Sequence, residues 1–193
     1  MKSKILNTLF VGIDVSSTEN VLCALDFSGN KLLQIKALNN QPGAESILDH
    51  ILGCLDSNSL KYAVIALEST SFYSTHIANF LSSNELLLAY EPLVYCLNPK
   101  VVANYRKSFV DMDKTDPLDA YIIADFARCG RITSQPWRGA QFLALQRLTR
   151  HRLHLIECVT REKTYMVSNI YLKFSELATG DKQERPFSNT YGV

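Results

Sequence analysis

The first forty residues alternate short apolar runs with polar breaks, as β-strands and turns do. Three segments rich in β-forming residues are separated by the polar stretches SSTE and SGN, and they are TLFVGIDV (8–15), NVLCALDF (20–27) and KLLQIKAL (31–38). Gly29 and Asn30 suit the tight turn between the second and third segments. The pattern predicts a three-stranded antiparallel meander.

Helical and strand patterns then alternate along the chain. Helical spacing of apolar residues is found in GAESILDHILGCL (43–55), SFYSTHIANFL (71–81) and VVANYRKSF (101–109), and short apolar runs typical of strands are YAVIAL (62–67) and LVYCLNP (93–99). A helical pattern restarts at Pro117, a residue favoured in the first turn of a helix. The order βββαβαβα predicts an α/β domain, with a mixed five-stranded sheet flanked by helices.

A different pattern begins near residue 138. The stretch from Ala140 to Phe174 contains no glycine or proline, and its leucines recur at steps of three and four residues. We expect one long helix, with an apolar seam for another helix formed by Leu143, Leu148, Leu155 and Val159. The predicted division of the chain is 1–137 for the α/β domain, 138–178 for the helical extension and 179–193 for a polar tail that we interpret as the start of a further domain.

The charges of the whole chain nearly balance, with 20 basic against 19 acidic residues in 193. Net charge therefore gives no sign of a nucleic-acid or membrane partner. The local distribution differs, because the long helix carries five basic residues against two acidic ones between residues 147 and 163. The candidates for phosphate contact are Lys100, Arg106, Lys107, Arg147, Arg150, Arg152, Arg161 and Lys163.

The cysteines favour a reduced, cytoplasmic protein. There are five, widely spaced and without a C-x-x-C pair, which argues against a disulfide framework and a zinc site. The amino terminus begins with two lysines and apolar residues, but Asn7, Thr8 and Asp14 interrupt the resemblance to a secretory signal. No apolar run reaches the length of about 18 residues that a membrane-spanning helix needs.

The segment DMDKTDPLDA, residues 111–120, contains four aspartates. Asp116 and Asp119 are three residues apart, so in a helix they lie on one face of its first turn. Such carboxylates repel each other unless a cation lies between them, although Asp116 before Pro117 also suits a simple capping role. Asp111 and Asp113 are interpreted as residues of a solvated loop.

Two further acids stand at the ends of predicted strands. Asp14 interrupts the apolar first strand, and Glu68 directly follows the fourth. In open α/β sheets, ligands collect at the carboxyl ends of the strands. If the first and fourth strands are neighbours, Asp14 and Glu68 face Asp116 and Asp119. Four carboxylates suit Mg²⁺ or Mn²⁺, and they suit a pair of such ions engaged in phosphoryl transfer.

The motifs VGIDVS, ALESTSFY, NPKVVANYRKS and DKTDPLDAYIIADFA resemble, in this order and spacing, the amino-terminal DEDD domain of the insertion-sequence-110 family of transposases, which includes the pilin-gene invertases. The resemblance covers about residues 8–175. It implies a RuvC-like, ribonuclease H-type fold and a Mg²⁺-binding tetrad of Asp14, Glu68, Asp116 and Asp119. It also implies DNA recombination, in many members guided by a structured bridge RNA, and pairing of protomers into a dimer or tetramer through the long helix.

Two departures from the family pattern bear on function. Ser71 stands where the family usually has glycine after E-x-T. The family's DNA nucleophile is thought to be a serine of a carboxyl-terminal domain, and no serine among Ser16, Ser17, Ser69 and Ser71 matches it. We therefore expect residues 1–193 to bind metal and nucleic acid without completing recombination.

Other functions compatible with these residues remain open. A Holliday-junction resolvase or nuclease has the same fold. A sugar-kinase-like or actin-like ATPase also places an aspartate at the end of its first strand, but the glycine-rich phosphate loops expected there are missing. A non-catalytic nucleic-acid-binding or assembly module would use the long helix for pairing and retain the acids without a chemical role.

Overall fold

The computed structural model describes residues 2–69, 72–109 and 116–179. Asp111, Asp113 and Ser71 lie outside these ranges. The chain divides into two compact units, residues 1–139 and residues 140–193.

The first unit is built on one five-stranded sheet. Its strands are β1 (Thr8–Val15), β2 (Glu19–Leu25), β3 (Lys31–Leu38), β4 (Tyr62–Glu68) and β5 (Leu93–Leu97). They lie in the order β3-β2-β1-β4-β5, in which β1 pairs with β2 and β2 with β3 in antiparallel fashion, and β4 lies parallel to both β1 and β5. This mixed topology is that of the ribonuclease H-like fold, and it confirms the fold class predicted from the sequence.

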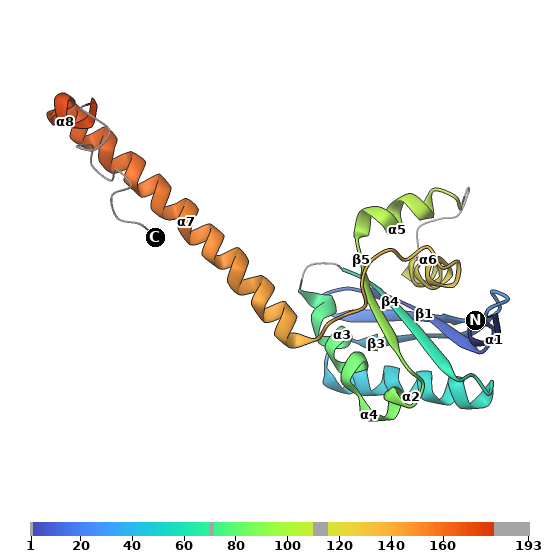
Figure 1. Ribbon diagram of the computed structural model, residues 1–193. Coiled ribbons are helices and arrows are strands. Elements are labelled where there is room, and N and C mark those ends of the chain that lie inside the picture. Colours follow the sequence, from blue (N-terminus) through green and yellow to red (C-terminus); the bar gives the residue numbers. More distant parts are fainter. Residues whose placement is uncertain (1, 70–71, 110–115, 180–193) are drawn as a thin grey trace. The chain divides into compact units, whose positions relative to one another are not determined.

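Helices cover both faces of this sheet (Figure 1). They are α1 (Lys2–Leu6), α2 (Gln41–Ser57), α3 (Tyr73–Ser83), α4 (Glu85–Leu88), α5 (Pro99–Arg106) and α6 (Asp116–Arg128). Asparagine side chains begin three of them. The Asn40 side chain accepts a hydrogen bond from the amide of Gly43 at the start of α2, that of Asn84 from Leu86 at the start of α4, and that of Asn98 from Lys100 at the start of α5. The residue types of the sequence thus fix where these helices start.

Alternation along the strands divides the core into two layers. Leu9, Val11 and Ile13 of β1 are buried against α2 and α3. Phe10, in contrast, belongs to the layer beneath α6. Because successive side chains of a strand point to opposite faces, each strand residue is assigned to a layer by its parity.

The segment that follows α6 returns to the edge of the sheet. The Trp137 amide donates to the carbonyl of Val94 in β5 at 2.7 Å. The indole Nε1 of the same residue donates to the Asn79 side chain on α3 at 2.8 Å. Part of the edge strand β5 is therefore hydrogen-bonded to this segment.

The second unit contains α7 (Ala140–Lys173) and α8 (Ser175–Thr179). None of the 34 residues of α7 is buried. In the described ranges, no helix combines the length and apolar character needed to cross a membrane.

The element predictions were largely confirmed, with two main differences. The short helices α1, α4 and α8 were not predicted, because four or five residues are too few for a recognisable helical period. The helix predicted to restart at Pro117 includes Asp116 as its first residue. The predicted domain boundaries at residues 137 and 178 stay predictions.

Candidate metal and nucleic-acid site

The pairing of β1 with β4 brings the first two acids of the predicted tetrad together. Along these parallel strands Gly12 lies beside Ala66 and Ile13 beside Leu67. One further step reaches Asp14 on β1 and Glu68 on β4. Two acids that are 54 positions apart in sequence therefore stand at the carboxyl ends of adjacent strands, as the sequence predicted for neighbouring strands.

Strand parity places both acids on the α6 face of the sheet. Asp14 is two residues beyond Gly12, and Glu68 is two residues beyond Ala66, which belongs to the core layer beneath α6. Both side chains are half-buried. Within the described residues Asp14 and Glu68 both have interaction partners.

Gly12 explains how closely α6 approaches this part of the sheet. A Cβ atom built on Gly12 would lie 2.3 Å from the backbone oxygen of Ala120 and 2.3 Å from the backbone nitrogen of Ala124. Real Cβ atoms do not tolerate such contacts, so only glycine permits this packing. The helix is thus held against β1 two residues before Asp14.

Asp116 and Asp119 lie in the first turn of α6, three residues apart. Asp119 directly precedes Ala120, the residue that packs on Gly12, and its side chain is 16% exposed. Asp116 is exposed. The four predicted acids therefore belong to one face and one end of the fold, with Asp119 the more enclosed of the two helical carboxylates.

A basic residue contacts the Asp119 carboxylate. The Arg106 guanidinium, at the end of α5, forms an ion pair with the Asp119 carboxylate through Nη1. The Arg106 side chain is 25% exposed, and its buried Nη2 has no hydrogen-bond partner among the residues that the structure describes. Arg106 was predicted as a phosphate contact, but its neighbour here is a member of the acidic tetrad.

The four side chains of the predicted tetrad suit a hard divalent cation by their chemistry, since all of them are carboxylates. In the described part of the chain, however, no three acidic, histidine or cysteine side chains come close enough to hold a metal ion. The structure therefore brings the acids to one region without closing a ligand set. The Arg106 guanidinium balances the charge of Asp119, which a bound metal ion would otherwise neutralise.

The other predicted phosphate contacts are exposed. They are Lys100 and Lys107 around α5, and Arg147, Arg150, Arg152, Arg161 and Lys163 on α7. Nothing in the structure assigns these side chains to a nucleic acid. Their exposure leaves the prediction untested.

A buried network that the sequence reading missed supports the helices of the site. Asp125, in the middle of α6, is 6% exposed and accepts hydrogen bonds from the Tyr105 hydroxyl at 2.7 Å and from Arg128 at 2.6 and 2.8 Å. Arg128 also donates to the carbonyl of Phe27 beyond β2, at 3.1 Å. Burial, followed by hydrogen bonds with Cys129 and Asp125, raises the pKa of the Tyr105 hydroxyl. An acid within the apolar run IIADFA was the available signal for this network.

Lys36 approaches the same face from the outer strand β3. Its ammonium forms a 2.6 Å ion pair with Glu19, and the Gln34 side chain on the same strand donates to the carbonyl of Pro117 in α6 at 3.2 Å. The hydrogen bond to Glu19, together with the charges of Glu19 and Asp116, raises the pKa of Lys36. The first turn of α6 therefore has contacts with both α5 and β3.

Comparison with known families shows to which protein family the chain belongs. Residues 11–173 match the model of the DEDD domain of insertion-sequence-110 elements, described as a transposase. The chain belongs to this transposase family. The match includes all four acids of the tetrad as well as the whole of α7, and it confirms the resemblance identified from the sequence motifs. No curated protein matches the chain.

Solved structures give a more distant likeness. Two are of Thermus thermophilus RuvC, one alone and one in complex with a Holliday junction substrate. Each is 17% identical to this member of the transposase family and is covered over 99% of its length, with 67% of the present chain aligned. The TM-scores are 0.42 for the complex and 0.43 for RuvC alone.

Proposed function

We propose that residues 1–139 are the metal-dependent nucleic-acid-processing domain of a DNA transposase or site-specific recombinase. Asp14, Glu68, Asp116 and Asp119 are the proposed ligands of Mg²⁺ or Mn²⁺. The observation that carries this proposal is the parallel register of β1 and β4, which sets Asp14 beside Glu68 on the face covered by α6. A merely capping role for Asp116 would not explain two further acids at the adjoining strand ends.

The residues of the site have separate tasks in this proposal. The strand acids Asp14 and Glu68 supply rigid oxygen donors, because their backbones are fixed within the sheet. Asp116 and Asp119 supply donors from a helix end that Gly12 allows to pack close by. Bound divalent metal would polarise a phosphodiester and stabilise the charge that develops on it. Because the Asp119 side chain is only 16% exposed, water has limited access to this donor.

The exposed basic residues support nucleic acid as the partner. Lys100 and Lys107 lie at either end of α5, close in sequence to Arg106 and so to the tetrad, while the others extend along α7. Cationic side chains of this kind neutralise backbone phosphates, so affinity for DNA should fall steeply as salt rises. Following the family, the partners that we propose are DNA and a guide RNA, and we expect residues 1–193 alone to leave strand exchange incomplete.

Mn²⁺ binding measured by calorimetry tests the proposed tetrad. Asp14→Asn and Asp116→Asn are expected each to abolish or greatly weaken binding, because they remove donors from β1 and from α6, about a hundred positions apart in the chain. Asp49→Asn is the matched control, since Asp49 is an exposed aspartate on α2, the helix that covers the other face.

The outcome separates the possible functions. Binding that is indifferent to both tetrad variants, in chains that remain folded, would contradict the metal site. Nicking of branched DNA by residues 1–193 alone would instead favour a resolvase-like nuclease.

A further inference from the structure

One asparagine side chain joins three segments of the chain at the acidic end of the sheet. Asn39 directly follows β3, and because β1 and β3 both run antiparallel to β2, it lies at the same edge of the sheet as Asp14. Its side-chain Nδ2 donates to the carbonyl of Ser16 at 2.8 Å and to the carbonyl of Tyr73 at 3.3 Å. Asn39 therefore links the turn after β1 to the first residue of α3.

The two carbonyls belong to the segments that follow the strand acids of the proposed tetrad. Ser16 is two residues beyond Asp14, and Tyr73 is five residues beyond Glu68. Residues near the ends of strands move more freely than residues in their centres, so the contacts of the next segment affect how precisely the acids are held. A donor shared by both segments constrains the ends of β1 and β4 together.

The turn after β1 is compact, so a contact with it reaches the strand. The Ser16 amide donates to the carbonyl of Glu19 at 2.8 Å, and the Ser16 hydroxyl accepts from the Glu19 amide at 3.0 Å. The backbone amide of Asn39 donates to the carbonyl of Thr18 in this turn at 2.8 Å. Asn39 thus binds the turn through its backbone and through its side chain.

The neighbouring residue Asn20 orients the amide of Asn39. Asn20, on β2, is 1% exposed, and its Nδ2 donates to the Asn39 Oδ1 at 3.3 Å. Because Oδ1 of Asn39 is engaged as an acceptor, its Nδ2 is the atom directed at the two carbonyls. The Asn20 Oδ1 is buried without a hydrogen-bond partner in the described part of the chain, which makes Asn39 the side-chain partner of a buried amide.

The partners of Asn39 distinguish it from the asparagines that cap helices. Asn40 accepts a hydrogen bond from Gly43, three positions away, and its effect is local to the start of α2. The side-chain partners of Asn39 are 23, 34 and 19 positions away in the chain. Its contacts therefore fix tertiary structure at the end of the sheet where the acids lie.

We propose that Asn39 is a positioning residue for the metal site, which sets the spacing of Asp14 and Glu68 by holding the segments that follow them. The proposal rests on the proposed function and deepens it. Asn39 is not itself a ligand, since its amide is used on Ser16, Tyr73 and Asn20. A metal such as Mg²⁺ requires its oxygen donors at about 2.0–2.1 Å in a nearly fixed geometry, so looser strand ends bind it less tightly.

Calorimetry with Mn²⁺ on residues 1–193 tests this role in two variants. Asn39→Asp keeps an acceptor for Asn20 but cannot donate to the two carbonyls, and its added negative charge alone would attract a cation. Asn39→Ala removes the donor and the acceptor without adding charge. Both variants are expected to weaken Mn²⁺ binding about tenfold, as the loss of a group that orients metal ligands does.

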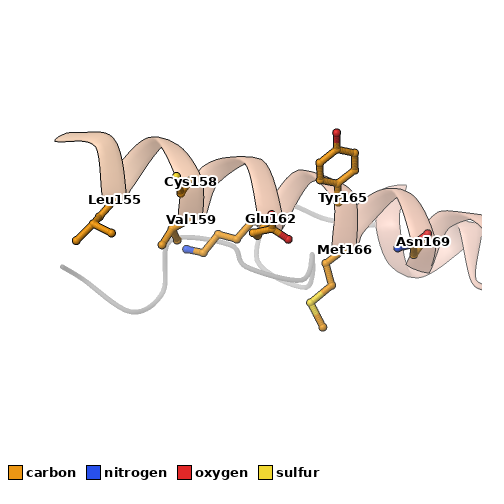
Figure 2. Close-up of a pocket in the computed structure, with 8 residues that line it drawn as sticks. Leu155, Cys158, Val159, Glu162, Tyr165, Met166 and Asn169 are labelled. Carbon is orange, nitrogen blue, oxygen red and sulfur yellow. The ribbon is translucent and has the colours of Figure 1, made fainter. Parts of the chain in front are cut away.

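Two asparagine controls separate positioning from general stability. The Asn58 side chain donates to the carbonyl of Cys54 at 2.8 Å, at the far end of α2, a helix about 25 Å long. Asn58→Ala should lower the free energy of unfolding, measured with urea, and leave Mn²⁺ affinity unchanged. Asn169, labelled in Figure 2, is an exposed asparagine of α7, and Asn169→Ala should change neither quantity.

The role of Asn39 and the metal site fail in different ways. A wild-type chain that does not bind Mn²⁺, or binding that survives Asp14→Asn, contradicts the metal site and the role of Asn39 with it. If Asp14→Asn abolishes binding but Asn39→Asp binds as tightly as wild type, only the role of Asn39 is overturned. Equal weakening by Asn58→Ala and the Asn39 variants would also overturn it, because the effect would then follow stability.

Discussion

The helices α6 and α7 bury very different fractions of their residues. Seven of the 13 residues of α6 are buried, and none of the 34 residues of α7 is. Both contain apolar residues at helical spacing, so the spacing alone does not show what covers a helix. The helix α6 is covered by the sheet of its own chain, whereas apolar side chains of α7 such as Leu148 and Val159 are more than half exposed. Burial thus distinguishes the helix that positions the candidate site from a helix whose apolar side chains remain accessible.

The largest effect is expected where α6 meets the sheet. Gly12→Ala forces a Cβ atom against the backbone of α6, which must shift, and we expect the free energy of unfolding to fall by about 3 kcal/mol. Urea denaturation measures the change. Gly53→Ala is the matched control, because no atom lies within 4 Å of the added carbon and the residue is inside α2. That control should stabilise the chain by roughly 0.5–1 kcal/mol. Equal responses would contradict the close packing of α6 on β1.

A pH titration tests the packing between the sheet and α6 through a residue of the sheet. Cys23 of β2 is fully buried beneath α6, and burial raises the pKa of its thiol from 9.0 to about 11. The unfolded thiol loses its proton first. The contribution of Cys23 to the free energy of unfolding is therefore complete below pH 9 and is lost as pH rises through about 11. The expected loss is about 2 kcal/mol.

Cys23→Ala isolates this contribution from other groups that titrate at high pH. The variant is expected to be less stable at pH 8 but to lose less stability than wild type between pH 8 and pH 10.5. Curves of stability against pH that run parallel for the two chains would show that the thiol is hydrated in the folded state.

A smaller effect is expected at the exposed start of α6. Arg106→Gln removes the cation that contacts Asp119, so Mn²⁺ no longer competes with a guanidinium, and its affinity should rise about fivefold. Calorimetry with Lys107→Gln as the control measures this, since Lys107 lies next in the chain and its ammonium donates to the Asn104 side chain at 3.3 Å. Weaker binding by the Arg106 variant would mean that the arginine orients the carboxylate for the metal.

The sequence was sufficient to predict those strands and helices whose formation depends on local residue patterns. The β-forming residues of TLFVGIDV predicted β1 with its observed bounds, and the absence of glycine and proline predicted α7 to within a few residues. The positions of Asp14 and Glu68 followed once β1 and β4 were taken as neighbours, which the register confirmed.

Other features depend on contacts between distant segments, which a single sequence does not reveal. The ion pair of Arg106 with Asp119 requires the ends of α5 and α6 to meet, and the same residue read in isolation resembles an ordinary phosphate contact. Asp125 breaks an apolar run, but its partners Tyr105 and Arg128 are apparent only after α5 has packed on α6. The acids could therefore be named from the sequence, and their immediate neighbours could not.

The hydrogen bonds of Trp137 have a spectroscopic consequence. It is the sole tryptophan of the chain, and it lies between the edge strand β5 and helix α3. Intrinsic tryptophan emission therefore originates entirely from this one corner of the sheet, whereas the far-ultraviolet circular dichroism signal also includes α7. If the two units unfold separately, the two signals will change at different denaturant concentrations, and the chain supplies this distinction without any added label.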